Sequence, residues 1–185
     1  AFDGLDAEFA GKAPYDQTGR FINYYNRNDQ GQITNEAPFG YETEGIGEYY
    51  LCPRRTKQEC ITEPYLYPVQ GKDVLMTSIV APIMVDGEFN GETGVDISLD
   101  SLQAYINAQD IYDGAGELML ISYGGTLAAV KGQPEMVGKP GNELHPEMVS
   151  GGLLSRIQHG ETVVDYNGNE LEVFVPVYFG NTTTP

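Results

Sequence analysis

Three tyrosines and one aspartate, spread over three short segments of the chain, have a chemistry that suits the binding of a small molecule. The segments are Glu48-Tyr49-Tyr50, Glu63-Pro64-Tyr65 and Gly94-Val95-Asp96-Ile97. Tyrosine rings attract cations through their faces, and a carboxylate accepts charge-assisted hydrogen bonds from an amine or ammonium group. If the segments converge, they form one cleft for a small cationic ligand, which predicts a receptor and not a catalyst.

Asp96 is the leading candidate for a ligand contact. It stands between Val95 and Ile97 in an apolar strand, where a carboxylate needs a polar or charged partner. The alternative is that Asp96 caps the helix that follows, although Ser98 or Asp100 could do so instead.

Tyrosines supply most of the remaining expected contacts. Tyr49, Tyr50 and Tyr65 are predicted to touch the ligand, although a chain with 13 tyrosines also places such rings in its core or at the rim of a site. Further candidates come from the same half of the chain. They are Tyr24, Tyr25 and Tyr41 as walls, Glu48 as a contact to a cation or a solvent-exposed residue, and Ser78 with Met76 as pocket floor or core.

The charge balance favours cationic partners. Lys and Arg number 10 against 27 Asp and Glu, which gives a net charge of -17. Such a surface repels nucleic acid and anionic lipid and attracts cations over long range, so no nucleic-acid partner is expected. Solubility alone is the other explanation of the charge. The sequence has no signal peptide and no run of roughly 20 apolar residues, so we expect a soluble protein or the soluble part of a longer one.

Catalytic patterns do not occur in the sequence. The carboxylate pairs Asp110/Asp113 and Glu42/Glu44 have no histidine nearby, and there is no nucleophile elbow or phosphate-binding loop. We therefore predict neither an enzyme nor a bound cofactor. A carbohydrate-binding or adhesive β module is a third class, and the glycine-punctuated α/β pattern argues against it.

Histidines and cysteines are too few and too scattered for a familiar metal motif. His145 and His159 are distant from the two cysteines and lack zinc-ligand spacing, so no metal site is expected. Cys52 and Cys60 could form a disulfide or remain small buried thiols, and the sequence leaves both open.

The predicted elements place the candidate residues in the first half of the chain. A hairpin is expected from strands at 20–25 and 32–34, followed by a helix at 44–58 that Pro53 breaks. Residues 61–69 are expected to be extended, and their two prolines favour an edge or bulged strand. The longest apolar run, 74–85, ends in the two-residue turn Asp86-Gly87 and leads into a strand at 88–97. A helix at 100–107 follows.

After residue 116 the order of predicted strands and helices partly repeats. Strands are expected at 117–123 and 126–130, a helix at 145–158, and strands at 161–166 and 170–179. This order predicts an α/β (α+β) fold with antiparallel sheets, duplicated as domains at 1–108 and 109–185. The second copy lacks a final strand and the chain begins abruptly, so we expect a fragment of a longer protein.

Several segments, taken in order, carry a family resemblance. They are Phe2-Asp3-Gly4-Leu5-Asp6, Thr18-Gly19-Arg20-Phe21, Tyr49-Tyr50, Thr62-Glu63-Pro64-Tyr65, residues 71–78, Ala81-Pro82-Ile83 and residues 91–99. Together they resemble the double Cache sensor domain of bacterial methyl-accepting chemotaxis receptors. The likeness extends over almost the whole chain and is strongest between residues 47 and 102.

The resemblance implies an architecture and a place in the cell. It implies two tandem PAS-like modules in a periplasmic segment between two transmembrane helices of an inner-membrane receptor, with a cytoplasmic signalling domain in the same chain. Members of the family form homodimers through a long N-terminal helix, which is missing here. Their usual ligand site lies in the membrane-distal module, here residues 1–108, and the output can also be a histidine kinase or a cyclase.

One departure from the family pattern bears on the ligand. The amino-acid-binding branch has an arginine two residues before its aromatic-tyrosine pair, a later tyrosine, and an aspartate at the end of the last strand; these positions match Gly47, Tyr49-Tyr50, Tyr65 and Asp96. Glycine cannot hold a ligand carboxylate as arginine does, and Arg54 and Arg55 are expected to be solvated. Amines, polyamines or quaternary ammonium compounds are therefore the leading ligand class, before amino acids, purines and small carboxylates.

Overall fold

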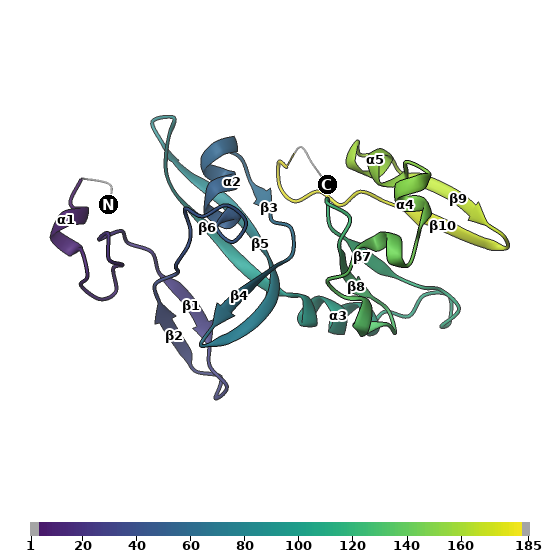
Figure 1. Ribbon diagram of the computed structural model, residues 1–185, viewed down its shortest axis with the longest axis horizontal. Coiled ribbons are helices and arrows are strands. Elements are labelled where there is room, and N and C mark those ends of the chain that lie inside the picture. Colours follow the sequence, from purple (N-terminus) through teal and green to yellow (C-terminus); the bar gives the residue numbers. More distant parts are fainter. Residues whose placement is uncertain (1–3, 183–185) are drawn as a thin grey trace.

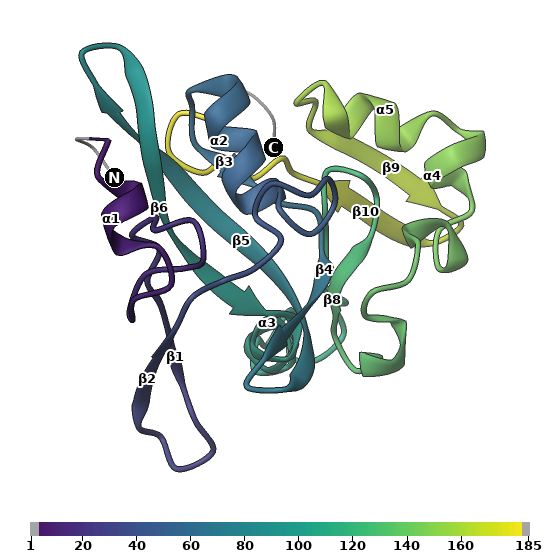
Figure 2. The same ribbon diagram turned by 60° about the vertical axis from the view of Figure 1, so that its left-hand side comes forward.

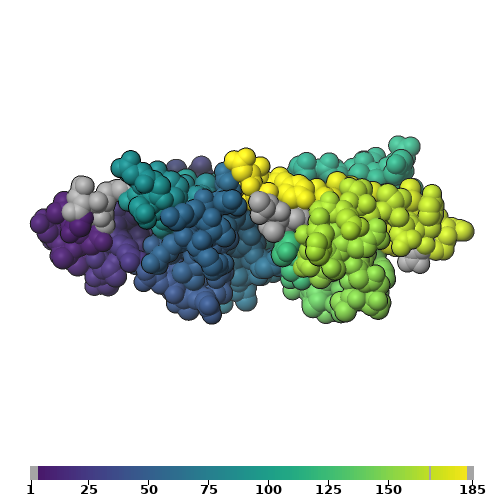
Figure 3. Space-filling model, turned by 90° about the horizontal axis from the view of Figure 1, so that it is seen from above, coloured from purple at the N-terminus to yellow at the C-terminus, as the bar shows by residue number. Residues whose placement is uncertain are grey.

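The structure is a computed structural model that describes residues 4–182, except for the side chain of Asn167. Residues 1–3 and 183–185, at the outer ends of the two predicted domains, lie outside the described part, as do Phe2 and Asp3 of the first resemblance segment. The molecule is elongated, and the sequence runs from one end to the other before residues 175–182 turn back toward the middle (Figure 3). The mixed α/β fold with antiparallel sheets is confirmed.

A four-stranded antiparallel sheet lies at the centre of the first half. Its strands are β3 (Cys60–Ile61), β4 (Tyr65–Val69), β5 (Lys72–Val85) and β6 (Glu88–Ser98). The long strand β5 pairs with β3 and β4 on one side and with β6 on the other (Figure 1). The predicted turn is confirmed: Asp86 and Gly87 both have positive φ, 52° and 82°, as the two-residue turn of this hairpin requires.

Helix α2 (Glu48–Thr56) packs against β3, β5 and β6 (Figure 2). Our prediction that Pro53 breaks this helix is wrong. Pro53 is buried inside α2, and the helix continues to Thr56, where Lys57 adopts a left-handed conformation at the C-cap. A disulfide joins Cys52 of α2 to Cys60 of β3, which settles the choice that the sequence left open.

The N-terminal part contributes a short helix, α1 (Asp6–Phe9), and a hairpin of β1 (Tyr24–Arg27) and β2 (Ile33–Glu36). The first strand begins four residues later than predicted. Oδ1 of Asp16 accepts hydrogen bonds from the backbone N–H of Thr18 at 2.8 Å and of Arg20 at 3.1 Å. These bonds fold residues 16–20 into a turn, which delays the strand.

Helix α3 (Leu99–Asn107) connects the central sheet to the second half. The buried side chain of Gln103 makes two hydrogen bonds to the backbone of Val130 on β8, as a neighbouring strand would. Its amide nitrogen donates to the carbonyl at 2.6 Å, and its amide oxygen accepts from the N–H at 2.8 Å. No helix within residues 4–182 is long and apolar enough to cross a membrane.

The second half holds two separate two-stranded sheets and several short helices. The elements are β7 (Met119–Ile121), β8 (Leu127–Val130), the 3-10 turns Pro134–Met136 and Gly141–Glu143, α4 (Glu147–Ser150), α5 (Leu153–Gln158), β9 (Val163–Asn167) and β10 (Glu170–Phe174). The single helix predicted at 145–158 is therefore wrong. Gly151 and Gly152 interrupt it, and Gly152 has a left-handed φ of 69°.

The chain after β10 is irregular, although a strand was predicted as far as residue 179. It returns alongside the first half, where Nδ2 of Asn181 donates to Oε1 of Glu59 at 3.4 Å. The buried cluster of the second half lies between α4, α5 and β9 and consists of Met148, Leu153 and Val163.

Candidate functional site

Three predicted site residues form a hydrogen-bonded row across the central sheet. Ser78 on β5 is directly opposite Asp96 on β6, and its hydroxyl donates to Oδ1 of Asp96 at 2.6 Å. On the other side, the hydroxyl of Tyr65 on β4 lies 2.7 Å from Oγ of Ser78. Ser78 is completely buried, whereas Asp96 is exposed and reachable by a ligand. The row therefore presents a carboxylate on a fixed polar floor.

Asp96 does not cap the following helix. Oγ of Ser98 accepts the N–H of Ser101 at 3.2 Å and fills that role at the start of α3. The carboxylate of Asp96 instead accepts a hydrogen bond from Ser78 of the neighbouring strand and remains exposed on the surface of the sheet.

A tyrosine cluster adjoins this row and is centred on Tyr67. The rings of Tyr24, Phe39, Tyr49 and Tyr65 lie 5.2–6.2 Å from the ring of Tyr67, centroid to centroid. Tyr67 is only 4% exposed, and its hydroxyl donates to the carbonyl of Phe39 at 3.2 Å and accepts from the N–H of Phe39 at 3.0 Å. Tyr67 is therefore the rigid centre against which the other rings are positioned.

Glu92, which the sequence analysis did not single out, adds a second carboxylate. It is on β6, four residues before Asp96, so both side chains leave the same face of the strand. Burial, and then the charge of Asp96, raise the pKa of Glu92 to about 7. Glu92 is therefore only partly ionised near neutral pH, and a cation bound beside it would restore its charge.

The carboxylates of Asp96 and Glu92 also raise the pKa values of nearby tyrosine hydroxyls. Burial, the charge of Asp96 and a hydrogen bond to Asp96 raise the pKa of Tyr24. Burial and the neighbouring Tyr67 raise the pKa of Tyr49, with a smaller effect from Glu92. The charged groups that act on these hydroxyls, among the described residues, are all carboxylates.

Tyr41 and Tyr50 lie in a different cluster from Tyr49 and Tyr65. Their rings are 5.5 Å apart, and the hydroxyl of Tyr41 donates to Oδ2 of Asp16 at 2.7 Å. Successive residues on a helix point about 100° apart, so Tyr49 and Tyr50 cannot face the same way. Tyr41 and Tyr50 thus anchor the N-terminal segment to α2.

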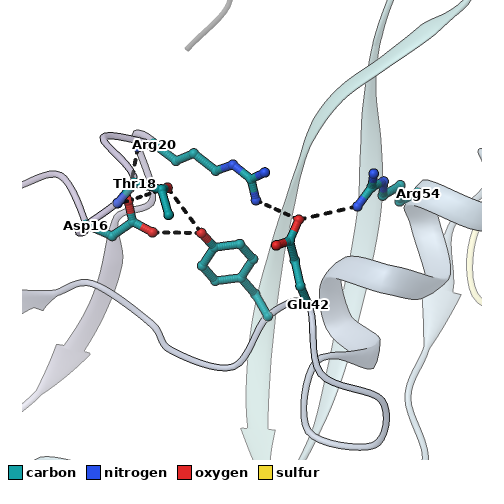
Figure 4. Close-up of polar contacts among 6 residues, drawn as sticks. Asp16, Thr18, Arg20, Glu42 and Arg54 are labelled. Carbon is teal, nitrogen blue, oxygen red and sulfur yellow. Dashed lines mark hydrogen bonds and ion pairs between the residues drawn. The ribbon is translucent and has the colours of Figure 1, made fainter. Parts of the chain in front are cut away.

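Two arginines complete that anchor (Figure 4). Glu42 lies between Arg20 and Arg54, with N–O distances of 2.9 Å and 3.5 Å. The guanidinium of Arg20 lies 5.3 Å from the ring centre of Tyr41, and that of Arg54 lies 5.8 Å from the ring centre of Tyr50. Both cations are therefore engaged away from Asp96.

The remaining predicted residues lie at the margin of the site or in the core. Tyr25 is 64% exposed, because neighbouring residues of β1 alternate and Tyr24 takes the inward position. Glu48 forms an ion pair with Arg55 at 3.1 Å and lines an open hollow of about 440 Å³ beside Tyr65. Met76 is 2% exposed and lies in the core.

Gly47 has a steric reason to be glycine. A Cβ atom at this position would lie 2.6–2.7 Å from the carbonyl oxygens of Gly40, Tyr41 and Thr43. No side chain fits there in this backbone, so the arginine of the amino-acid-binding pattern has no place in this chain.

Two residues of the site could have been found by counting along strands. Glu92 and Tyr67 share a strand face with Asp96 and Tyr65, four and two residues away. Neither residue was predicted as part of the site: Glu92 lies in a polar, glycine-rich stretch, and Pro68 follows Tyr67.

Comparison with known proteins identifies relatives of the chain. Methyl-accepting chemotaxis protein TlpQ of Pseudomonas aeruginosa is 28% identical over 190 residues, covering 96% of this chain and 26% of TlpQ. Methyl-accepting chemotaxis protein PscA of Pseudomonas syringae pv. tomato is 31% identical over 142 residues, covering 76% of this chain and 21% of PscA. The chain thus spans about a quarter or less of the length of these relatives.

Solved structures share the fold. The extracellular domain of mmHK1S-Z3, which is classed as a histidine kinase, is 29% identical with a TM-score of 0.73, over 88% of this chain and 57% of that one. The periplasmic sensory domain of the Campylobacter jejuni chemoreceptor Tlp1 is 17% identical with a TM-score of 0.58, over 85% of this chain and 57% of that one, and shows the fold alone.

A sequence profile matches residues 5–104, more than half of the 185 residues, and includes the row, the tyrosine cluster and Glu92. Its description is the first PDC sensor domain of methyl-accepting chemotaxis protein-like proteins. The chain therefore belongs to the family of methyl-accepting chemotaxis protein-like PDC sensor domains.

Proposed function

We propose that the chain is the extracytoplasmic sensor of a transmembrane chemoreceptor and binds a small amine-bearing ligand at Asp96 and Glu92. One observation carries this proposal: two carboxylates share a strand face beside a tyrosine cluster, and the charge of one helps to raise the pKa of the other to about 7. Positive charge bound beside them relieves their repulsion. The ligand is an amine, a polyamine or a quaternary ammonium compound.

The contacts divide between charge and aromatic surface. Ammonium groups of the ligand donate charge-assisted hydrogen bonds to Asp96 or Glu92, each worth about 1.5–3 kcal/mol. The rings of Tyr49 and Tyr65 add cation–π attraction of roughly 0.5–2 kcal/mol each. Ser78 holds the carboxylate of Asp96 in place through its 2.6 Å hydrogen bond.

Ligands that need a carboxylate receptor are disfavoured. Position 47 cannot carry an arginine, Arg54 is engaged by Glu42, and Arg55 is engaged by Glu48. Amino acids therefore rank second, through their amine alone, and purines stacking on the tyrosines rank third.

The wider receptor follows from the family and belongs to the same proposal. Residues 1–108 form the distal, ligand-binding module of a double Cache sensor and residues 109–185 belong to the proximal module, in a homodimer linked to a cytoplasmic signalling domain. The profile match that ends at residue 104 supports the boundary. Ligand closure over Tyr49 tightens the distal module, and signalling requires that the two receptor states differ in ligand affinity.

A sensor histidine kinase is the second candidate for the complete receptor. The likeness to mmHK1S-Z3 favours it, at 29% identity and a TM-score of 0.73. Ligand recognition in this chain is the same in both cases, and the segment that follows the sensor distinguishes them.

Thermal unfolding in the presence of small molecules tests the ligand class. Amines, amino acids, carboxylates without an amine, and purines are compared, and amines should stabilise the chain most. Asp96→Asn should then lower the affinity for the best amine by about tenfold to a hundredfold, from the loss of a charged hydrogen bond. Asp100→Asn is the matched control, since this exposed carboxylate lies on α3, outside the row. Preferential binding of amine-free carboxylates, or unchanged affinity in Asp96→Asn, would exclude the proposal.

A further inference from the structure

A histidine and two glutamates meet in the second half of the molecule, far along the chain from the amine site. They are His145, which precedes α4, Glu147 within α4, and Glu172 on β10. Nδ1 of His145 lies 2.9 Å from Oε1 of Glu147 and 3.9 Å from Oε1 of Glu172. One donor atom from each residue lies within 4.8 Å of the other two. Imidazole nitrogen and carboxylate oxygen are both ligands that zinc accepts.

Packing fixes two of the three donors. The imidazole of His145 stands edge-on to the ring of Phe174, with centroids 6.1 Å apart and planes at 90°. Glu172 shares the inward face of β10 with Phe174, which packs on the core of Met148, Leu153 and Val163. The side chains of His145 and Glu172 are 18% and 15% exposed, so both are held near the core while remaining reachable.

We propose that His145, Glu147 and Glu172 bind one Zn²⁺ ion, with water as the fourth ligand. Donors in a tetrahedral zinc site lie about 3.3 Å apart, since each metal–ligand bond is roughly 2.0–2.2 Å, so small side-chain rotations bring these three atoms into position. The two carboxylates neutralise the charge of the ion, and the imidazole favours zinc over calcium or magnesium, which prefer oxygen ligands.

The proposed zinc ion replaces the hydrogen that His145 and Glu147 share in the structure. Without metal, the 2.9 Å contact between His145 and Glu147 holds a proton. With metal, any proton on Nδ1 passes to solvent and the lone pair of Nδ1 binds the ion, so the imidazole carries its hydrogen on Nε2 only. The ion then joins the turn before α4 to β10 and stabilises the second half of the chain. None of the three zinc ligands takes part in the amine site, whose residues come from α2, β4, β5 and β6.

The sequence offered no familiar motif for this site. His145 and Glu147 lie close together in the sequence, whereas Glu172 follows only after helix α5 and strand β9. Only the fold brings them together, which is why the sequence analysis expected no metal.

Titration of ZnCl₂ into the chain, with a chromophoric chelator as competitor, tests the proposal. The chain should bind one Zn²⁺, and His145→Gln and Glu172→Gln should each lower the affinity by about tenfold or more, as loss of a ligand does. Co²⁺ in place of zinc should give the strong visible absorption of a four-coordinate site. Zn²⁺ should raise the melting temperature of the unsubstituted chain and not that of the two variants.

His159→Gln is the matched control. His159 is the second of the two histidines in the chain, and its Nδ1 lies 2.6 Å from the carbonyl of Ser155 at the end of α5. This variant should keep full zinc affinity. Should Glu172→Gln fail to fold by circular dichroism, the more exposed Glu147→Gln decides the question in its place. Absence of zinc binding, or equal affinity in the His145→Gln, Glu147→Gln and His159→Gln variants, would overturn the proposal.

Discussion

Glu63 accepts a hydrogen bond from the hydroxyl of Ser122 at 2.6 Å, across 59 residues of sequence. Its second carboxylate oxygen accepts the N–H of Gly124 at 2.7 Å. Glu63 stands between Thr62, whose Oγ1 accepts the N–H of Ser78 at 2.9 Å, and Pro64-Tyr65. A short stretch of chain thus connects the floor of the proposed amine site to the turn between β7 and β8.

Replacing this carboxylate should loosen the connection. Glu63→Gln keeps the volume of the side chain but removes the charge and one acceptor, so one of the two donors in the β7–β8 turn loses its partner. We expect the free energy of unfolding to fall by about 1 kcal/mol and the amide of Gly124 to exchange faster with solvent. Denaturant unfolding and amide hydrogen exchange measure both effects. Glu135→Gln, at an exposed carboxylate on a 3-10 turn, serves as control, and an equal effect there would contradict the role of Glu63.

Amine binding should strengthen with rising pH around neutrality. Burial and Asp96 raise the pKa of Glu92 to about 7 in the free protein, and a bound cation lowers that pKa by favouring the carboxylate. Binding therefore releases a proton from Glu92, and affinity should rise between about pH 6 and pH 8. Calorimetry in two buffers of different ionisation enthalpy measures the proton release. The Glu92→Gln variant should release none, and affinity that falls with pH in the unsubstituted chain would contradict this account.

The same carboxyl should make the ligand-free chain less stable at higher pH. The folded-state pKa of Glu92 is raised above its ordinary value of 4.5, so the folded chain binds this proton more tightly than the unfolded chain does. Between pH 4.5 and about 7 the stability contributed by this group is lost, because unfolding then releases a proton. The groups around it, Asp96 on the same strand and Tyr49 and Tyr65 from α2 and β4, do not offer a positive charge. Unfolding free energies at pH 5 and pH 8 should differ less in Glu92→Gln than in the unsubstituted chain; an unchanged difference would contradict the assignment.

The parts of this protein that the sequence predicted depend on local patterns. Strands β5 and β6 were predictable because a long apolar run meets the turn Asp86-Gly87, and their register then places Ser78 opposite Asp96. The separation of Tyr49 from Tyr50 was not predicted, although helix geometry implies it, because the later course of the chain decides which ring meets Tyr67. The second half was predicted less well, since its strands are short and Gly151-Gly152 divides the expected helix.

Tyr49 and Tyr50 should separate binding from stability. Tyr49 contacts Tyr67 in the tyrosine cluster, whereas Tyr50 packs on Tyr41 and Phe89. Tyr49→Leu should weaken amine binding by about threefold to thirtyfold, from the loss of cation–π attraction. Tyr50→Leu should leave affinity within about twofold but lower the free energy of unfolding by about 1–2 kcal/mol, because it loses two aromatic contacts. Calorimetry and urea unfolding on both variants check this, and equal loss of affinity would show that the two rings share one site.

Placing an arginine at position 47 should not convert the chain into a receptor for carboxylates. The Cβ atom alone would approach three carbonyl oxygens within 2.7 Å, so Gly47→Ala and Gly47→Arg both force the start of α2 away from residues 40–43. We expect each substitution to lower stability by about 1–3 kcal/mol, as overpacking does, and to weaken amine binding because Tyr49 lies in the first turn of the helix that moves. Thermal unfolding and amine titration of Gly47→Ala isolate the steric effect, since alanine adds no charge. A stable Gly47→Arg variant that gains affinity for amino acids would show that the loop before α2 can open, and that the ligand class is set by charge at this position and not by space.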